Sequence, residues 1–451
     1  MSNYLPTEQR RLAADHVPNQ LVVAIPDKSL VLDRLKALRL DARVSKVSWG
    51  LGLALVEIEN LDGRDFRDDI EATCRSPQLW WLPVPDPDPE RTSQLDAVLF
   101  LIRWYFATRY GGWTPTLAKN YEMETVTGLP HIDGIAPHAA YYPEPADAAL
   151  LRWAPQYLGR GVKVGIVDTP LYECRLLREH YVAPDRLPMR GYPTDGGLSQ
   201  WAGHNDMCTG LIVQQAGGVE IFAEPVLRPE TATTTSWHLA ESMVALRDAG
   251  VSIINVSAGC STRDGRAPLV LERAIDNLWP DVLIVASVGN HGNQPVPPFD
   301  PREPLGPTSP MWPAANPRVL SVGSYGVIDK RLCLAEFNPP VPWQTLVAKG
   351  VDVVSTYLES EVTIVHSAER VANGVRSTVS ATTETFTGVA RWSGSSFATA
   401  TVTGAIAARM TGGASAQEAL ARLMVDAATG VDGIWTYDEA TKWGCGPVST
   451  E

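Results

Sequence analysis

Three residues whose side chains can together cleave an acyl bond are Asp168, His204 and Ser396. A serine hydroxyl is a weak nucleophile unless a base accepts its proton, and histidine is a base of suitable strength. The imidazole in turn needs a buried carboxylate, such as Asp168, which fixes its tautomer and stabilises its cation. The side-chain amide of Asn290 and the backbone N–H of Ser396 could donate to the oxyanion of the intermediate.

Each of these residues, taken singly, also has an ordinary structural explanation. Asp168 and Asn290 suit turns, His204 suits the start of a helix, and serine is a preferred residue at a helix N-cap. Their positions favour the chemical interpretation, because each lies where a predicted strand ends or a predicted helix begins. In a parallel sheet these points fall on one edge, where the side chains can meet.

The stretch Trp392–Gly404, WSGSSFATATVTG, predicts a tight turn followed by a helix of small apolar residues. Such a helix is typical of close packing against other backbone. Gly394 is expected to adopt a backbone conformation closed to residues with a Cβ atom. Ser396 would then lie in the first helical turn, where the helix dipole favours a developing negative charge.

From Gly161 onward, short apolar runs alternate with helical patterns. This alternation predicts an α/β fold, a mostly parallel β-sheet with helices on both faces. Strands are predicted over 162–167, 220–222, 253–256, 282–286, 319–322 and 351–354, and helices over 204–214, 236–249, 269–278 and 415–428.

The N-terminal part predicts a small α+β domain. Strands over 20–25, 44–47 and 51–58 flank a helix over 27–38, and a Pro/Asp-rich linker follows at 83–91. We therefore divide the chain into an accessory domain over 1–92, a helical or irregular connecting segment over 93–160, and the large domain over 161–451. Within the connecting segment, helices are predicted over 95–110 and near 146–157.

Composition limits the classes of function. The chain has 451 residues, 45% of them hydrophobic, and a net charge of −13 that argues against nucleic-acid binding. No window of about 18 residues is uninterruptedly apolar, so no membrane span is expected. No phosphate-binding loop is present, and no cofactor is predicted. The six cysteines lack metal-ligand spacing, and the first 20 residues lack an apolar signal region, so free thiols in the cytoplasm are expected.

Six motifs resemble, in their order, those of the subtilisin-like serine proteases: VGIVDT, GHNDMCTG, INVSAG, VASVGN, WPAANPRVLSVGS and SGSSFATATVTG. The resemblance covers about 161–428 and implies that 161–451 is a subtilisin-like peptidase domain. It implies that Asp168, His204 and Ser396 form the catalytic triad and that Asn290 is the oxyanion donor. It also implies two segments that pair with the substrate as added strands, namely Ser257, Ala258 and Gly259, and Ser287, Val288 and Gly289.

The chain also departs from the family pattern. His204 is followed by Asn-Asp-Met where the family has Gly-Thr-His, and Ala400-Thr401 replaces a Pro-His pair. These differences indicate a divergent branch. The segment LIVQQAGGVEIF after the histidine helix lacks the extended calcium-binding loop of many relatives, so no metal site is expected.

Two functions remain open from the sequence. The first is an intracellular serine endopeptidase of restricted specificity that cleaves proteins or peptides and is held latent by its N-terminal region, with a possible activating or inhibitory protein partner. The second is an inactive pseudo-protease, or interaction module, whose cleft is filled by residues 1–150. A Cys208–His204 nucleophile is a third, weaker alternative. The N-terminal domain could be either a removable propeptide or a permanent accessory domain.

Overall fold

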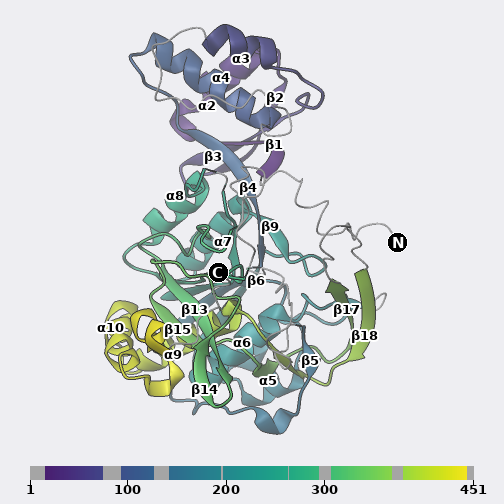
Figure 1. Ribbon diagram of the computed structural model, residues 1–451, viewed down its shortest axis with the longest axis vertical. Helices are drawn as coiled ribbons and strands as arrows, with labels where there is room; N and C mark the ends of the chain where they lie inside the picture. The colour runs from purple at the N-terminus through teal and green to yellow at the C-terminus, as the bar shows by residue number, and fades with distance from the viewer. Residues whose placement is uncertain are drawn as a thin grey trace.

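The computed structural model describes residues 16–74, 93–125, 142–193, 197–262, 264–293, 306–367 and 379–443. Its centre is an eight-stranded sheet of order β20-β15-β13-β12-β10-β6-β8, with β14 paired to β13 (Figure 1). The run from β8 to β15 is parallel, as the sequence predicts. The strands are β6 (Lys163–Asp168), β8 (Glu220–Pro225), β10 (Ile253–Val256), β12 (Leu283–Ser287), β13 (Leu320–Ile328), β14 (Arg331–Leu334), β15 (Leu346–Lys349) and β20 (Trp435–Thr436).

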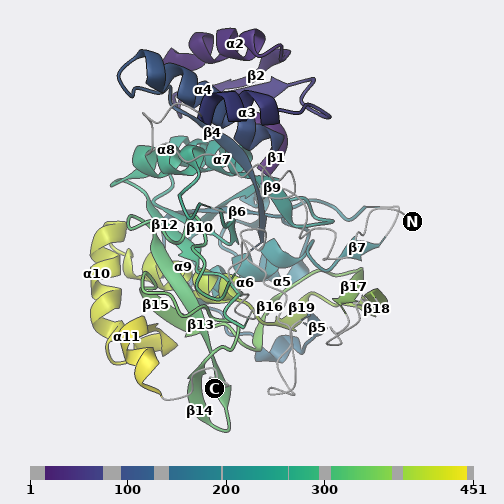
Figure 2. The same ribbon diagram turned by 45° about the horizontal axis from the view of Figure 1, so that its top comes forward.

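Helices cover both faces of this sheet, which confirms the predicted α/β class. Helices α6 (His204–Gln215) and α9 (Ser395–Arg409) lie on one face, and α7 (Ser236–Asp248) and α8 (Leu269–Leu278) on the other (Figure 2). Neighbouring residues of β10 show the alternation, since Ile253 packs with the α6–α9 layer and Ile254 with the α7–α8 layer. Helix α10 (Ala416–Ala427) packs on α9.

Helices α6 and α9, which carry His204 and Ser396, pack closely together. A Cβ atom at Gly404 would lie 2.8 Å from the carbonyl oxygen of Ile212, so only glycine allows this approach. The small apolar residues of α9 are buried along almost its whole length. The predicted close backbone packing of this helix is therefore confirmed.

The N-terminal residues form a separate antiparallel sheet of order β4-β1-β3-β2, with helices packed on it. Helix α4 and strand β4 belong to this unit, because their apolar side chains share one core with β1 and α2. The predicted boundary at residue 92 therefore falls inside a packed unit. Its elements are β1 (His16–Ala24), α2 (Lys28–Ala37), β2 (Ala42–Ser48), β3 (Leu53–Ile58), α3 (Arg67–Cys74), α4 (Gln94–Arg109) and β4 (Leu117–Thr125).

Strand β4 joins the N-terminal unit to the large domain. It pairs antiparallel with β9 (Thr233–Thr235) and β11 (Ala258–Gly259), placing Met123 opposite Thr234 and Glu124 opposite Gly259. The face of the N-terminal sheet that its own helices leave uncovered packs on α7 and α8 (Figure 2). Side chains of the N-terminal unit and of the large domain together form one apolar cluster there. The two parts thus contact each other through paired backbone and through buried apolar side chains.

Some predicted elements differ from the structure. The helix expected near 146–157 is not formed; this stretch holds only a single 3-10 turn, Ala148–Leu150. The strand expected at 351–354 forms as β16 (Val353–Thr356), but it pairs with β19 (Val389–Trp392) outside the central sheet. The remaining elements include β5 (Glu144–Pro145), α5 (Arg175–His180), β7 (Leu198–Ser199), β17 (Glu361–Ser367), β18 (Val379–Thr385) and α11 (Tyr437–Ala440).

Two expectations from composition have different outcomes. Within the described residues, no helix is both long and apolar enough to cross a membrane. Cys174 and Cys208 are free and buried. Cys333, however, is disulfide-bonded, so the expectation that all cysteines are free thiols is wrong.

Candidate active site

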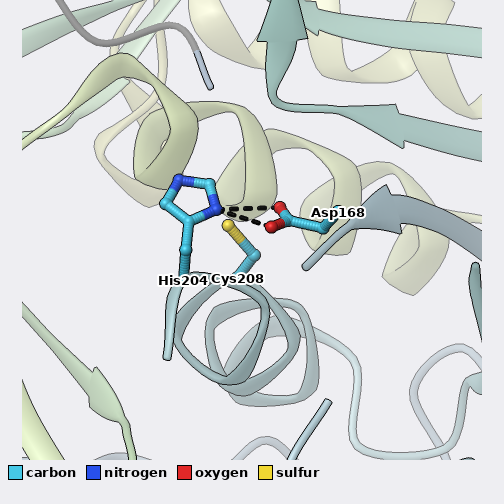
Figure 3. A group of neighbouring side chains, drawn as sticks. All are labelled: Asp168, His204 and Cys208. Carbon is cyan, nitrogen blue, oxygen red and sulfur yellow. Dashed lines mark hydrogen bonds and ion pairs between the residues drawn. The ribbon is translucent and has the colours of Figure 1, made fainter. Parts of the chain in front are cut away.

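Asp168 and His204 meet at the carboxyl edge of the central sheet. Strand β6 ends at Asp168 and α6 begins at His204. The imidazole Nδ1 lies 2.8 and 2.9 Å from the two carboxylate oxygens of Asp168, and both side chains are buried (Figure 3). The backbone N–H of Thr169 also donates to this carboxylate, over 2.7 Å. A carboxylate on Nδ1 fixes the tautomer in which Nε2 can accept a proton.

The start of α6 is held by contacts on several sides. The His204 ring lies 5.6 Å from the ring of Phe397 and meets Trp392 edge-on at 5.9 Å. Gly203 precedes it, and a Cβ atom there would lie only 2.3 Å from the Tyr357 ring. The side-chain amide of Asn205 donates to the backbone carbonyl of Thr169 at 2.7 Å. Asn205 thus ties the histidine helix to the segment after β6, a role that the sequence analysis did not find.

Ser395 and Asn290 form a fixed polar cluster at the start of α9. The Ser395 backbone N–H donates to Asn290 Oδ1 at 2.8 Å, and its hydroxyl lies 2.7 Å from the same oxygen. That hydroxyl is also within reach of Ser287 Oγ and the carbonyl of Gly289, at 2.5 and 3.1 Å. The two contacts with Asn290 engage the carbonyl end of its amide and so fix which way its Nδ2 donor end points.

Ser396 is the second residue of α9 and is 2% exposed. Within the described part of the chain, no hydrogen bond joins its hydroxyl to His204. Such contacts are often long in free enzymes and tighten when substrate binds. Phe397, the next residue, contacts the His204 ring, so the two helix starts face each other. The role of Ser396 as nucleophile stays a prediction.

Gly394, which caps α9, does not have the predicted special conformation. Its φ of 166° and ψ of 152° describe extended backbone that any residue adopts. A Cβ atom there would lie 3.6 Å from Asn290 Nδ2, an ordinary contact distance. The donor end of the Asn290 amide therefore lies beside the first turn of α9.

The six residues expected to bind substrate fall into two groups in the structure. Ala258 and Gly259 pair with β4, so this segment already carries an added strand. Ser287 and Gly289 contact Ser395 through hydrogen bonds, as described above. Ser257 and Val288 are buried beside these segments.

Two further titratable side chains lie on α6. Cys208 is completely buried, and burial raises the pKa of its thiol well above the usual value. Because the thiolate is the nucleophilic form, the Cys208–His204 alternative loses its chemical basis. Asp206 is also fully buried; burial raises the pKa of its carboxyl well above the usual value, although Oδ2 accepts the Tyr172 N–H at 3.3 Å. The sequence signal that could have drawn attention to Asp206 is its charge, two positions after His204.

The family assignment follows from this order of elements together with a match to a family model. The peptidase S8 model, described as the subtilase family, matches residues 159–442, more than half of the chain. The chain belongs to the subtilase family. Asp168, His204 and Ser396 all lie within the part of this subtilase that the family model matches.

Two known proteins illustrate the similarity. The subtilase is 29% identical over 146 residues to a thermophilic serine proteinase of Bacillus sp. (strain AK1), covering 32% of this chain and 31% of that protein. The crystal structure of fervidolysin from Fervidobacterium pennivorans, a keratinolytic enzyme related to subtilisin, aligns with a TM-score of 0.55 at 16% identity, covering 93% of this chain and 58% of fervidolysin. The chain thus spans about a third to somewhat over half of these relatives, and the structural likeness shows the subtilisin-like fold.

Proposed function

We propose that this subtilase is a serine endopeptidase in which Asp168, His204 and Ser396 act as the triad. The observation that carries the proposal is the buried Asp168–His204 pair, with Nδ1 at 2.8 Å from the carboxylate and the ring facing the start of α9. A buried, oriented imidazole of this kind serves as a general base. An inactive descendant would have no need to keep it.

In the proposed reaction, Ser396 Oγ attacks the carbonyl carbon of a peptide bond while its proton passes to His204 Nε2. Asp168 keeps Nδ1–H in place and stabilises the imidazolium. The oxyanion accepts hydrogen bonds from Asn290 Nδ2 and the Ser396 backbone N–H. His204 then protonates the leaving amine. In the second half of the reaction, water attacks the acyl-enzyme while His204 accepts its proton, and His204 then returns that proton to the departing Ser396 oxygen.

We further propose that the N-terminal unit holds the enzyme latent. Strand β4 pairs with Ala258 and Gly259, which are predicted to pair with the substrate backbone, and with β9 on its other side. A substrate would have to replace β4 between these two strands. Because such a groove admits one extended chain, it favours substrates that can adopt a strand, which supports restricted specificity.

The alternative function, an inactive interaction module, is favoured by the same filled groove. A fluorophosphonate probe on the full chain separates the two. Under our proposal the wild type is labelled, at least slowly, and Ser396→Ala is not. Ser393→Ala serves as the matched control and should still be labelled, because the Ser393 hydroxyl accepts the backbone N–H of Asp352 and is not part of the polar cluster that Ser395 forms with Asn290. No labelling of the wild type after prolonged incubation, with or without proteolytic removal of the N-terminal unit, would favour the inactive module.

A cytoplasmic site of action has less support. The disulfide at Cys333 favours an oxidising compartment, because cytosolic thiols are kept reduced. Fractionation of the source cells, with thiol alkylation before lysis, tests both the location and the redox state of Cys333.

A further inference from the structure

Cys208 lies beside the Asp168–His204 pair, on the same helix as His204 and one turn later (Figure 3). One ligand atom from each of the three side chains, Nδ1 or Nε2, Sγ and a carboxylate oxygen, lies within 4.8 Å of the others. In the described part of the chain, no other group of three His, Cys, Asp or Glu side chains meets this distance condition. None of the steps proposed above uses the thiol.

We propose that Asp168, His204 and Cys208 bind a divalent transition-metal ion such as Zn²⁺, and that this ion switches the active site off. Imidazole nitrogen, thiolate sulfur and carboxylate oxygen are the three ligand types that zinc prefers. The proximity of these three donors, all on buried side chains, carries the assignment.

The charges in this site favour a divalent ion. All three side chains are buried, and a buried charge is costly unless it is compensated. A carboxylate, a thiolate and a neutral imidazole together balance the two positive charges of Zn²⁺. The thiol alone resists ionisation because it is buried beside the carboxylate of Asp168, so its proton leaves only when the metal arrives.

The ion would stop the reaction through the imidazole tautomer. Without metal, Nδ1 carries a proton and donates it in a hydrogen bond to the Asp168 carboxylate. Nε2 then keeps its lone pair, which can accept the serine proton. When the metal takes Nδ1, that ring proton moves to Nε2, and the thiol proton is released to solvent. The protons balance, with one released per ion bound. An Nε2–H imidazole cannot accept the Ser396 proton, so the proposed base is lost without any change of fold.

Metal binding can be tested separately from peptidase activity by using the full-length Ser396→Ala chain. Isothermal titration with Zn²⁺ should give one site per chain, and titrations in two buffers of different ionisation enthalpy should count one released proton. Co²⁺ should give a thiolate-to-cobalt absorption band. Adding Cys208→Ala, or the volume-conserving Cys208→Ser, should weaken affinity by at least about tenfold and remove the band. Cys174→Ala is the matched control, since Cys174 is also free and buried.

Inhibition is tested on the active chain, and this part rests on the proposed function. Zn²⁺ should block fluorophosphonate labelling of the wild type, EDTA should restore it, and Cys208→Ser should be labelled equally with and without Zn²⁺. Equal Zn²⁺ affinity in the Cys208 variants, or no binding in the Ser396→Ala chain, would overturn the site. Binding that leaves labelling unaffected would overturn the switch. A wild type that is never labelled would instead reject the peptidase, while the titrations still decide the metal site.

Discussion

Weakening strand β4 should open the substrate groove, and Met123 is the residue at which to test this. Its side chain is 2% exposed and packs in the cluster that β4 shares with α7 and α8, not in the core of the N-terminal unit itself. The energetic loss from Met123→Ala should therefore fall mainly on the docking of β4. Truncating a buried methionine to alanine typically costs about 2–5 kcal/mol.

The magnitude follows from this energy. Because about 1.4 kcal/mol changes an equilibrium constant tenfold, the population with an open groove should rise by about thirtyfold to a few thousandfold. The rate of fluorophosphonate labelling of Ser396 reports this population when opening is fast relative to labelling. Intact mass before each assay ensures that the chain is uncut.

Glu122→Ala provides the matched control on the same strand. Glu122 is opposite Thr235 in the register and its side chain is exposed, so its truncation removes little buried apolar surface and should accelerate labelling far less than Met123→Ala. The reasoning fails if Met123→Ala and Glu122→Ala label at the wild-type rate, or if both accelerate labelling equally. Circular dichroism of each variant checks that the N-terminal unit is folded.

Three other predictions follow from the site. Asn290→Ala should lower kcat by about a hundred- to thousandfold with little change in KM, the loss known for one such donor in subtilisin; an unchanged kcat would remove Asn290 from the oxyanion site. Gly203→Ala should lower the free energy of unfolding in urea by about 1–3 kcal/mol, because its Cβ would meet the Tyr357 ring, whereas Gly191→Ala, with open space around it, should not. Burial lowers the pKa of His291 to about 4, below its unfolded value near 6.5, so the unfolded chain binds a proton first and stability falls as pH drops from 6.5 to 4. His291→Gln should remove up to about 3 kcal/mol of that pH dependence, and an identical pH profile would contradict the assignment.

The sequence predicted the central sheet well because its strands are continuous apolar runs. Both faces of the parallel sheet are covered, so residues such as Val164 on one face and Ile254 on the other are buried. The resulting continuous apolar runs are easy to recognise as strands. Strand β15 was not predicted because Leu346–Lys349 ends in a charged residue, while the neighbouring run 351–354, with three valines, gives the stronger apolar signal. The helix expected at 146–157 is not formed. Its apolar residues instead pack, as an irregular segment, against the core of the large domain, and their spacing resembles that of a helix.

The candidate site was only partly predictable for a different reason. The positions of Asp168 and His204 follow from strand and helix ends, which local sequence marks. Strand β4 fell within the predicted connecting segment and was not predicted as a strand. Its residues alternate between buried and exposed only over the last five positions, 121–125. Its partners, β9 and β11, are more than 100 residues away in the chain. Such long-range pairing leaves no local signal in a single sequence.

The packing of the N-terminal unit bears on whether it is a propeptide or a permanent domain. Val22 and Leu53 of this unit lie in one buried cluster with Trp237 and Met243 of α7. At their boundary, Asn120 Oδ1 accepts the Trp237 backbone N–H and the Ser236 hydroxyl, both at 3.0 Å. Interfaces that resemble a divided core are typical of permanent association. We therefore expect a chain nicked after β4 to stay together in native gel filtration and to label slowly until the fragment is displaced. If the nicked fragments separate at micromolar concentration, this packing does not hold them, and the unit is a removable propeptide.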